Sequence, residues 1–266
     1  FLKEFGEAAE ERSGIAMAQA PQARTDILET LKRDGLSLRA ASDFWKSDFD
    51  AVLTAVKHNG NALEYASENL RDSSPIVTEA CRSVSPALKF ASSRLNLDPD
   101  FLLSLIEQDI LPLHGVAEEM SQNKKVVMAA VSKKGAQLEY AHCSLQCDRE
   151  VVLAAVSTTG KALRFAAAEF WEDKQVVMAA IANDASAISL TCSLCGDKEV
   201  ALAAVSRDGS TLKFVSDALK NDRDVVLSAV KTNGRVLGIA GLNLRNDKEI
   251  VQAAVGANAK SLKLPL

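Results

Sequence analysis

Five cysteines are the residues whose spacing most resembles a chemical site. Cys192 and Cys195 form a C-x-x-C pair, Cys143 and Cys147 form a C-x-x-x-C pair, and Cys81 stands alone. Two such pairs could supply the four thiolates of a tetrahedral zinc site. Whether they do depends on how far apart the fold places them.

Other chemistry-bearing residues form no recognisable arrangement. His58, His114 and His142 do not stand in an H-E-x-x-H motif or next to a plausible nucleophile. The glycines are periodic and form no phosphate-binding loop, and most acidic residues fall at positions that suit helix caps. The sequence therefore predicts no catalytic residue, no cofactor, no small-molecule substrate and no enzyme activity.

A repeated unit of 25 residues organises the chain. Copies begin at positions 23, 48, 73, 98, 123, 148, 173, 197, 222 and 247, and the copy from Asp173 is one residue short. A fixed period of this size is typical of a solenoid. We number positions within a repeat from its first residue, which is position 0.

The repeat separates the two cysteine pairs. They lie two copies apart, and because packed helices stand 8–10 Å apart, the pairs should be roughly 20 Å from each other. Cys81 occupies an apolar column, where cysteine acts as a small filler. We therefore expect no metal site. An odd number of cysteines also favours a reducing intracellular compartment, either the cytoplasm or an organelle such as a plastid.

Each repeat reads as two short helices. Position 0 is usually Asp or Asn, which caps a helix by accepting hydrogen bonds from its first turn. Position 12 is usually glycine, which suits a left-handed C-terminal cap. Between them, Val151 to Val156 leave no polar side, so we expect this helix to be buried all round. Alanine recurs at position 7, where it would let neighbouring helices approach closely.

The second helix is expected to be amphipathic. Leu163, Ala166 and Phe170 follow one face of a 3.6-residue period. A strand–helix repeat of leucine-rich type is the alternative, because a short apolar run fits either element. Alanine is depleted in strands, and caps bracket the run, so an all-α solenoid of about ten helix-pair repeats is favoured.

The repeat resembles a known family. The pattern D-x-x-V-V-x-x-A-V-x-x-x-G-x-x-L-x-x-A-x-x-x-L is similar to the tandem repeat called domain of unknown function 4116. The best-matching copies are Asp48–Leu70, Asn123–Leu145, Asp148–Phe170, Asp197–Leu219 and Asp222–Leu244. This resemblance implies a helical array and carries no accepted activity or catalytic residues.

The chain is expected to form one repeat domain, residues 23–266, after a segment of residues 1–22 that caps the array or docks elsewhere. Within the array, Asp98–Gln122 is the most divergent copy. It has no glycine at position 12 and carries Pro112, so we expect a bend or a distorted second helix there.

The amino-acid composition limits the classes of partner that the chain is expected to bind. The net charge is −4 and the pI is near 5.5, which argues against a nucleic-acid groove. Aromatic residues make up 5% of the chain. No apolar run approaches the ~20 residues that a membrane helix needs. An extended surface for protein partners is the favoured function; an accessory structural subunit of a large assembly, in an organelle for example, is the alternative.

Four aromatic residues are the candidate partner-binding residues. Trp171 and Phe44 occupy columns that are otherwise mostly polar, and Phe1 and Phe5 lie in the N-terminal segment. A Trp on a partner-facing surface is a frequent binding anchor. The alternative for Trp171 is that its ring folds back over the junction between repeats. Trp45 shares its column with leucines and is expected to be core.

Overall fold

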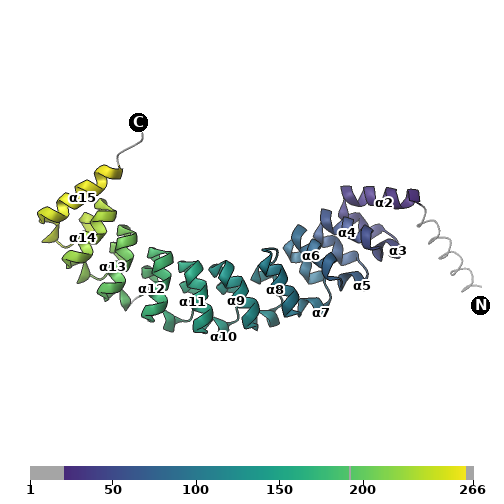
Figure 1. Ribbon diagram of the computed structural model, residues 1–266, viewed down its shortest axis with the longest axis horizontal. Helices are drawn as coiled ribbons and strands as arrows, with labels where there is room; N and C mark the ends of the chain where they lie inside the picture. Colours follow the sequence, from purple (N-terminus) through teal and green to yellow (C-terminus); the bar gives the residue numbers. More distant parts are fainter. Residues whose placement is uncertain (1–20, 192, 262–266) are drawn as a thin grey trace, which may run out of the picture. The chain divides into compact units, whose positions relative to one another are not determined.

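The computed structural model describes residues 21–191 and 193–261, and over them it is all helical, with no strand. The predicted fold class is therefore confirmed. By its internal contacts the chain divides into two compact units, Phe1–Val126 (unit 1) and Val127–Leu266 (unit 2). Phe1 and Phe5 lie outside the described residues. Figure 1 shows the longer helices following one another in chain order.

The first element of each repeat is an α-helix, usually of ten residues. These helices are α2 (Pro21–Arg33), α4 (Phe49–His58), α6 (Ser74–Ser83), α8 (Pro99–Glu107), α9 (Lys124–Lys133), α11 (Arg149–Thr158), α12 (Lys174–Asn183), α13 (Lys198–Arg207), α14 (Arg223–Thr232) and α15 (Lys248–Ser261). Successive helices pack on one another: α2, α4 and α6 in unit 1, and α11 to α15 in unit 2.

The predicted second helix consists of two pieces. The first piece is a 3₁₀-helix, and these are η1 (Gly35–Ala40), η2 (Gly60–Tyr65), η3 (Ser85–Phe90), η4 (Leu113–Gly115), η6 (Gly135–Tyr140), η7 (Gly160–Phe165), η9 (Ala185–Leu190), η11 (Gly209–Phe214) and η13 (Gly234–Ile239). The second is a single short turn: α3 (Asp43–Lys46), α5 (Glu68–Arg71), α7 (Ser93–Asn96), η5 (Glu118–Gln122), α10 (Cys143–Gln146), η8 (Ala168–Trp171), η10 (Leu194–Gly196), η12 (Leu219–Asn221) and η14 (Leu244–Asn246).

Spacing explains why the second helix is not one α-helix. Gly160, Leu163 and Ala166 are all buried, and their separation by three residues matches the three residues per turn of a 3₁₀-helix. Ala166 then has extended backbone, with φ −78° and ψ 157°, which ends the 3₁₀ turn. The chain restarts as the short η8, whose Phe170 packs into the core. The 3.6-residue period predicted through these residues is therefore wrong.

The predicted helix caps are confirmed at most copies. Asp148, for example, accepts hydrogen bonds from the backbone N–H groups of Glu150 and Val151 at 3.0 and 3.3 Å. Ser73 is an exception, because its side chain makes no such bond to α6. Each cap satisfies donors that the first turn of a helix leaves unpaired.

The glycines at position 12 are not left-handed caps, since none of the described glycines has a positive φ. They are needed because the next repeat lies too close for a side chain. A Cβ on Gly160 would overlap the carbonyl oxygen of Ala180 and lie 2.9 Å from the nitrogen of Asp184. The glycine of one repeat therefore packs on the position-7 alanine of the next, and the predicted close approach at that alanine column is confirmed.

The divergent copy does contain a left-handed cap. Asp109, with φ 59°, is the one described non-glycine residue with positive φ. Ile110 N–H donates to Leu105 O and Asp109 N–H to Ile106 O, both at 2.9 Å, which is the bonding pattern of a Schellman motif. The following 3₁₀-helix, η4, has three residues instead of six. The expected distortion of the second helix is confirmed.

Candidate interaction surface

The first helices are not buried on all sides, contrary to the sequence prediction. In α11, positions 3, 4, 7 and 8 are fully buried, whereas Leu153 and Ala154 at positions 5 and 6 remain half-buried. The contacts of α11 with α12 and with the 3₁₀-helices η6 and η7 leave one narrow face of the helix open.

The same two positions stay half-buried in the next three repeats. Because α11 to α14 pack side by side, these side chains form a continuous row, which we call the apolar stripe: Leu153, Ala154, Met178, Ala179, Leu202, Ala203 and Leu227. Position 6 holds a small residue, alanine or serine, in all four repeats. No other described part of the chain covers it fully.

A row of ion pairs crosses the N-terminal ends of the same helices. A basic residue at position 1 contacts carboxylates at positions 0 and 2 of the next repeat. Lys174 Nζ lies 2.8 Å from Asp197 and 2.7 Å from Glu199. Lys198 Nζ lies 2.8 Å from both Asp222 and Asp224.

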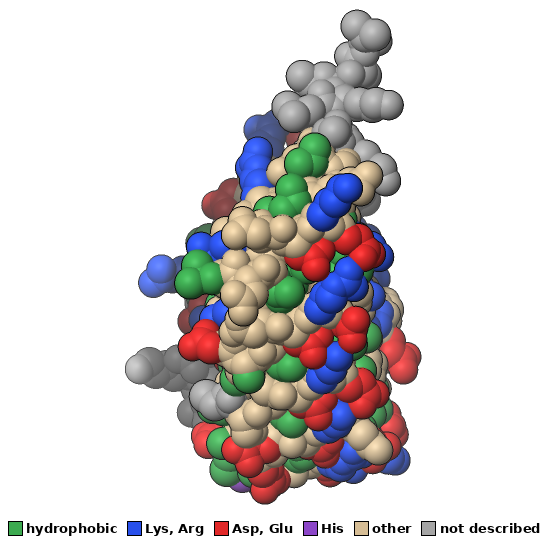
Figure 2. All heavy atoms as spheres, turned by 90° about the vertical axis from the view of Figure 1, so that its left-hand side faces the viewer, with side chains coloured by type: hydrophobic (Ala, Val, Ile, Leu, Met, Phe, Trp, Pro, Cys, Tyr) green, Lys and Arg blue, Asp and Glu red, His purple; other side chains and the backbone are tan. Residues whose placement is uncertain are grey.

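Two further contacts extend this ion-pair row. Arg223 pairs with Asp247 and Glu249. Arg149 pairs with Asp173 at 3.1 Å and donates to the amide oxygen of Gln175 at 2.7 Å. In unit 1, Arg24 makes the equivalent contacts, with Asp48 at 3.0 Å and Asp50 at 2.5 Å. Figure 2 shows basic and acidic side chains alternating down one side of the surface.

These contacts keep the row charged. The pKa of Asp197 is lowered, mainly by its hydrogen bond from Lys174, and the pKa of Asp222 is lowered in the same way by Lys198. The pKa values of Lys174 and Lys198 are raised by the same hydrogen bonds. Both signs of charge are therefore present across the physiological pH range.

The stripe and the ion-pair row share one face. Position 1 and position 5 are four residues apart and are neighbours on a helix surface, as with Lys198 and Leu202. The arrangement is therefore an apolar strip with a charged edge, which suits recognition of another macromolecule. None of the side chains in the stripe or the ion-pair row is poised for proton transfer or nucleophilic attack.

Trp171 and Phe44 do not project freely into solvent. Trp171 is half-buried, and its indole N–H donates to the carbonyl oxygen of Leu163 at 2.9 Å, so the ring folds back over its own repeat. Phe44 is half-buried and packs edge-on against Trp45, with ring centroids 4.9 Å apart. Trp45 is buried, as predicted. Partner binding by Trp171 and Phe44 remains a prediction.

Cys192 lies outside the described residues, and the contacts of Cys81 and His58 are structural. Burial raises the pKa of Cys81 to about 12, the opposite of what an activated thiolate nucleophile requires. His58 Nδ1 accepts the backbone N–H of Gly35 from the preceding repeat at 3.1 Å, and Ser83 does the same for Gly60 at 3.2 Å. Over the described residues, His, Cys, Asp and Glu form no group of three that could hold a metal ion.

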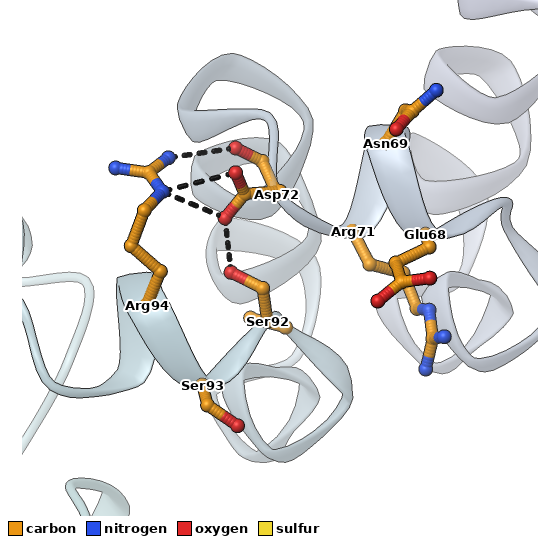
Figure 3. A pocket seen from close by; sticks show the side chains of 8 residues that line it. Glu68, Asn69, Arg71, Asp72, Ser92, Ser93 and Arg94 are labelled. Carbon is orange, nitrogen blue, oxygen red and sulfur yellow. Dashed lines mark hydrogen bonds and ion pairs between the residues drawn. The ribbon is translucent and has the colours of Figure 1, made fainter.

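A polar groove of about 580 Å³ lies in unit 1, between the third segments of two repeats. The pKa of Asp72 is lowered by the hydrogen bond that Ser92 donates to its carboxylate and by Arg94, whose Nε lies 2.9 Å from it (Figure 3). A second hollow of about 470 Å³ lies at the equivalent junction in unit 2, beside Lys220. Because the groove recurs with different side chains, it is a feature of the repeat junction.

The family relationship rests on more than half of the chain. The family described as "Domain of unknown function (DUF4116)" matches residues 24–71, 123–171 and 197–242. The chain belongs to this family. Each matched segment covers two of the 25-residue copies, and each copy consists of an α-helix, a 3₁₀-helix and a short third turn. No curated protein and no solved structure was found to match the chain.

Proposed function

We propose that this DUF4116 chain is a non-enzymatic scaffold that binds protein partners through the open face of its first helices. The apolar stripe carries this proposal. Seven apolar side chains in a row, held at a fixed spacing by the helices beneath, would gain free energy from burial at about 25 cal/mol per Å² of apolar area covered. A contiguous apolar surface of this kind typically marks a binding site.

Several observations support binding rather than catalysis. The charged groups with shifted pKa values are paired with neighbours in the same or the next repeat, and the buried thiol of Cys81 is deactivated. The excess of negative charge also supports a protein partner over a nucleic acid, whose phosphates would be repelled. None of the helices among the described residues is both long and apolar enough to cross a membrane.

Capture of partners from the source cells tests the proposal. The tagged chain would be isolated under mild conditions beside two variants: Met178→Gln with Leu202→Gln in the stripe, and Leu242→Gln as a control. Leu242 is 74% exposed and lies in the turn before η14, outside the first helices that carry the stripe. We expect the wild type and the control to enrich the same proteins, and the stripe variant to lose them at least fivefold.

Sizing of the isolated protein separates the two functional classes. A chain that elutes alone as well as with partners supports a scaffold. A chain found only in one large complex of constant composition supports the alternative, an accessory structural subunit. Equal enrichment by the stripe variant and the wild type would contradict binding through the first-helix face.

A further inference from the structure

We propose that the apolar stripe of unit 2 binds a basic amphipathic α-helix of a partner protein, lying across α11 to α14 with its cationic side chains along the ion-pair row. This inference rests on the proposed scaffold function and adds the chemistry and conformation of the partner. It follows from the spacing of the stripe, the charge beside it and the asymmetry between the two ends of the helices.

Spacing favours a helical partner. Packed helices stand about 8–10 Å apart, so Leu153, Met178, Leu202 and Leu227 are spaced by about that distance along the stripe. Seven residues of an α-helix rise about 10.5 Å and return to nearly the same face. A helix with apolar residues every seven positions therefore matches one side chain to each repeat. An extended segment would need three residues for the same span, and its successive matching side chains would point to opposite faces.

Charge favours a basic partner. Positions 0 to 2 of the five repeats from Asp148 read D-R-E, D-K-Q, D-K-E, D-R-D and D-K-E, which is nine carboxylates against five basic residues. Each of Lys174, Lys198 and Arg223 already contacts two carboxylates, so its charge is more than balanced. Glu199 and Asp224 are 69% and 68% exposed, which leaves their free oxygens available to a cation.

The two ends of the helices differ. Beyond the stripe, position 9 carries Ser157, Ala182, Ser206 and Lys231, which are mostly uncharged. Position 10 carries Thr158, Asn183, Arg207 and Thr232, so on the stripe's own face the carboxylates lie at the N-terminal edge, while Asp184 and Asp208 follow only after the helices end. A bound helix with Lys and Arg on one flank would be held in one orientation, because the opposite arrangement would leave its cations away from the carboxylates.

Fluorescence anisotropy with synthetic peptides and the full chain tests this inference. Three labelled 21-residue peptides would be compared: one with Leu at heptad spacing and Lys or Arg on one flank, the same peptide with Glu in place of each basic residue, and the basic peptide with its residues scrambled. We expect the basic amphipathic peptide to bind at least tenfold more tightly than either of the others, and to weaken as salt rises from 50 to 500 mM, values we choose to span strong and weak screening.

Variants locate the binding. Met178→Gln with Leu202→Gln should weaken the basic peptide at least tenfold. Glu199→Gln with Asp224→Asn should weaken it at least threefold and flatten the salt dependence. Leu242→Gln, and the neutralisation of two exposed carboxylates elsewhere (Asp43→Asn with Asp217→Asn), should leave binding unchanged. Thermal melting checks that each variant is folded, and single Met178→Gln replaces the double variant if the latter unfolds.

The outcomes separate this inference from the proposed function. Equal binding of the acidic or scrambled peptide, or binding that the stripe variants do not change, would overturn the basic-helix partner. If cellular partners still depend on Met178 and Leu202 while the basic peptide does not bind, the scaffold function stands and the partner chemistry is wrong. If the stripe variant still captured the cellular partners and the basic peptide did not bind, both the scaffold function through the stripe and the basic-helix partner would be overturned.

Discussion

At the scale of single residues, Gly160 shows how the array is packed. Because a Cβ there would overlap Ala180 O and approach Asp184, Gly160→Ala must push two repeats apart. We expect it to lower the free energy of unfolding by about 1–3 kcal/mol, the usual cost of overpacking. Gly238→Ala is the matched control, since nothing lies within 4 Å of the added carbon. Urea unfolding measures both; equal losses would show that backbone conformation, not close approach, requires glycine.

Trp171 is the second residue whose role the contacts define. Trp171→Phe keeps an aromatic ring over the repeat and removes the N–H bonded to Leu163 O. We expect the free energy of unfolding to fall by about 1 kcal/mol, the typical net value of one hydrogen bond. Thermal unfolding would measure the loss. An unchanged stability would indicate that the ring is free to serve a partner, as its column suggests.

At the scale of elements, the sequence predicted the first helices well and the remainder of the repeat only in outline. The aspartate caps, the buried valines and the position-7 alanine each act within or beside their own helix. Their recurrence at fixed positions of the repeat therefore predicts that helix directly. The 3₁₀ segment was missed because Gly160, Leu163 and Ala166 have a three-residue spacing that also occurs within an α-helical pattern. The open face and the inter-repeat contact of glycine depend on neighbouring copies, which no single repeat reveals.

The ion-pair row was also missed, although the sequence contains its signal. Basic residues at position 1 recur one repeat before acidic residues at positions 0 and 2, so each pair of this row joins residues 23 to 26 apart. Each contact lies at the surface, and a single surface ion pair is weak. Repetition places the same contact at successive junctions, so the row fixes the register of one helix against the next.

Acid should weaken this row in a predictable direction. The folded-state pKa values of Asp197 and Asp222 lie below the ordinary value of 3.8, chiefly because of Lys174 and Lys198. Their contribution to stability is therefore complete above the unfolded-state pKa and is lost as the pH falls through the lower folded-state pKa. Asp197→Asn with Asp222→Asn keeps the helix caps, since Asn caps as well as Asp, but removes the charge.

We expect this double variant to show a smaller loss of stability between pH 7 and pH 3 than the wild type, measured by urea unfolding at each pH. Asp43→Asn is the control, because the Asp43 side chain is fully exposed at 100% and lies in α3, outside the row. An identical pH dependence in all three proteins would mean that the row does not contribute to folding.

At the scale of the whole molecule, the divergent copy precedes the boundary between the two units. Asp98–Gln122 has a short η4 and a left-handed Asp109, and the boundary follows at Val126. Its loop lacks the close glycine–alanine contact that regular copies have. We expect hydrogen exchange to show weaker protection over Ile110–Gly115 than over Thr159–Leu163; equal protection in the two loops would contradict this.

A fragment that begins at the boundary between the two units should fold better than a fragment that begins elsewhere in the array. A fragment of residues 123–266 keeps Asn123, whose side chain accepts the N–H groups of Lys125 and Val126 and so caps α9. We expect this fragment to be helical by circular dichroism and to unfold cooperatively in urea. A fragment of residues 197–266 cuts inside unit 2, where it removes the Lys174 contacts and the helices α9, α11 and α12, of which α12 packs on α13. Because a solenoid is stabilised by its nearest-neighbour interfaces, the shorter fragment should unfold at a clearly lower urea concentration. If residues 123–266 were instead unfolded, unit 2 would depend on unit 1, and the boundary at Val126 would not mark an independently folding part of the array.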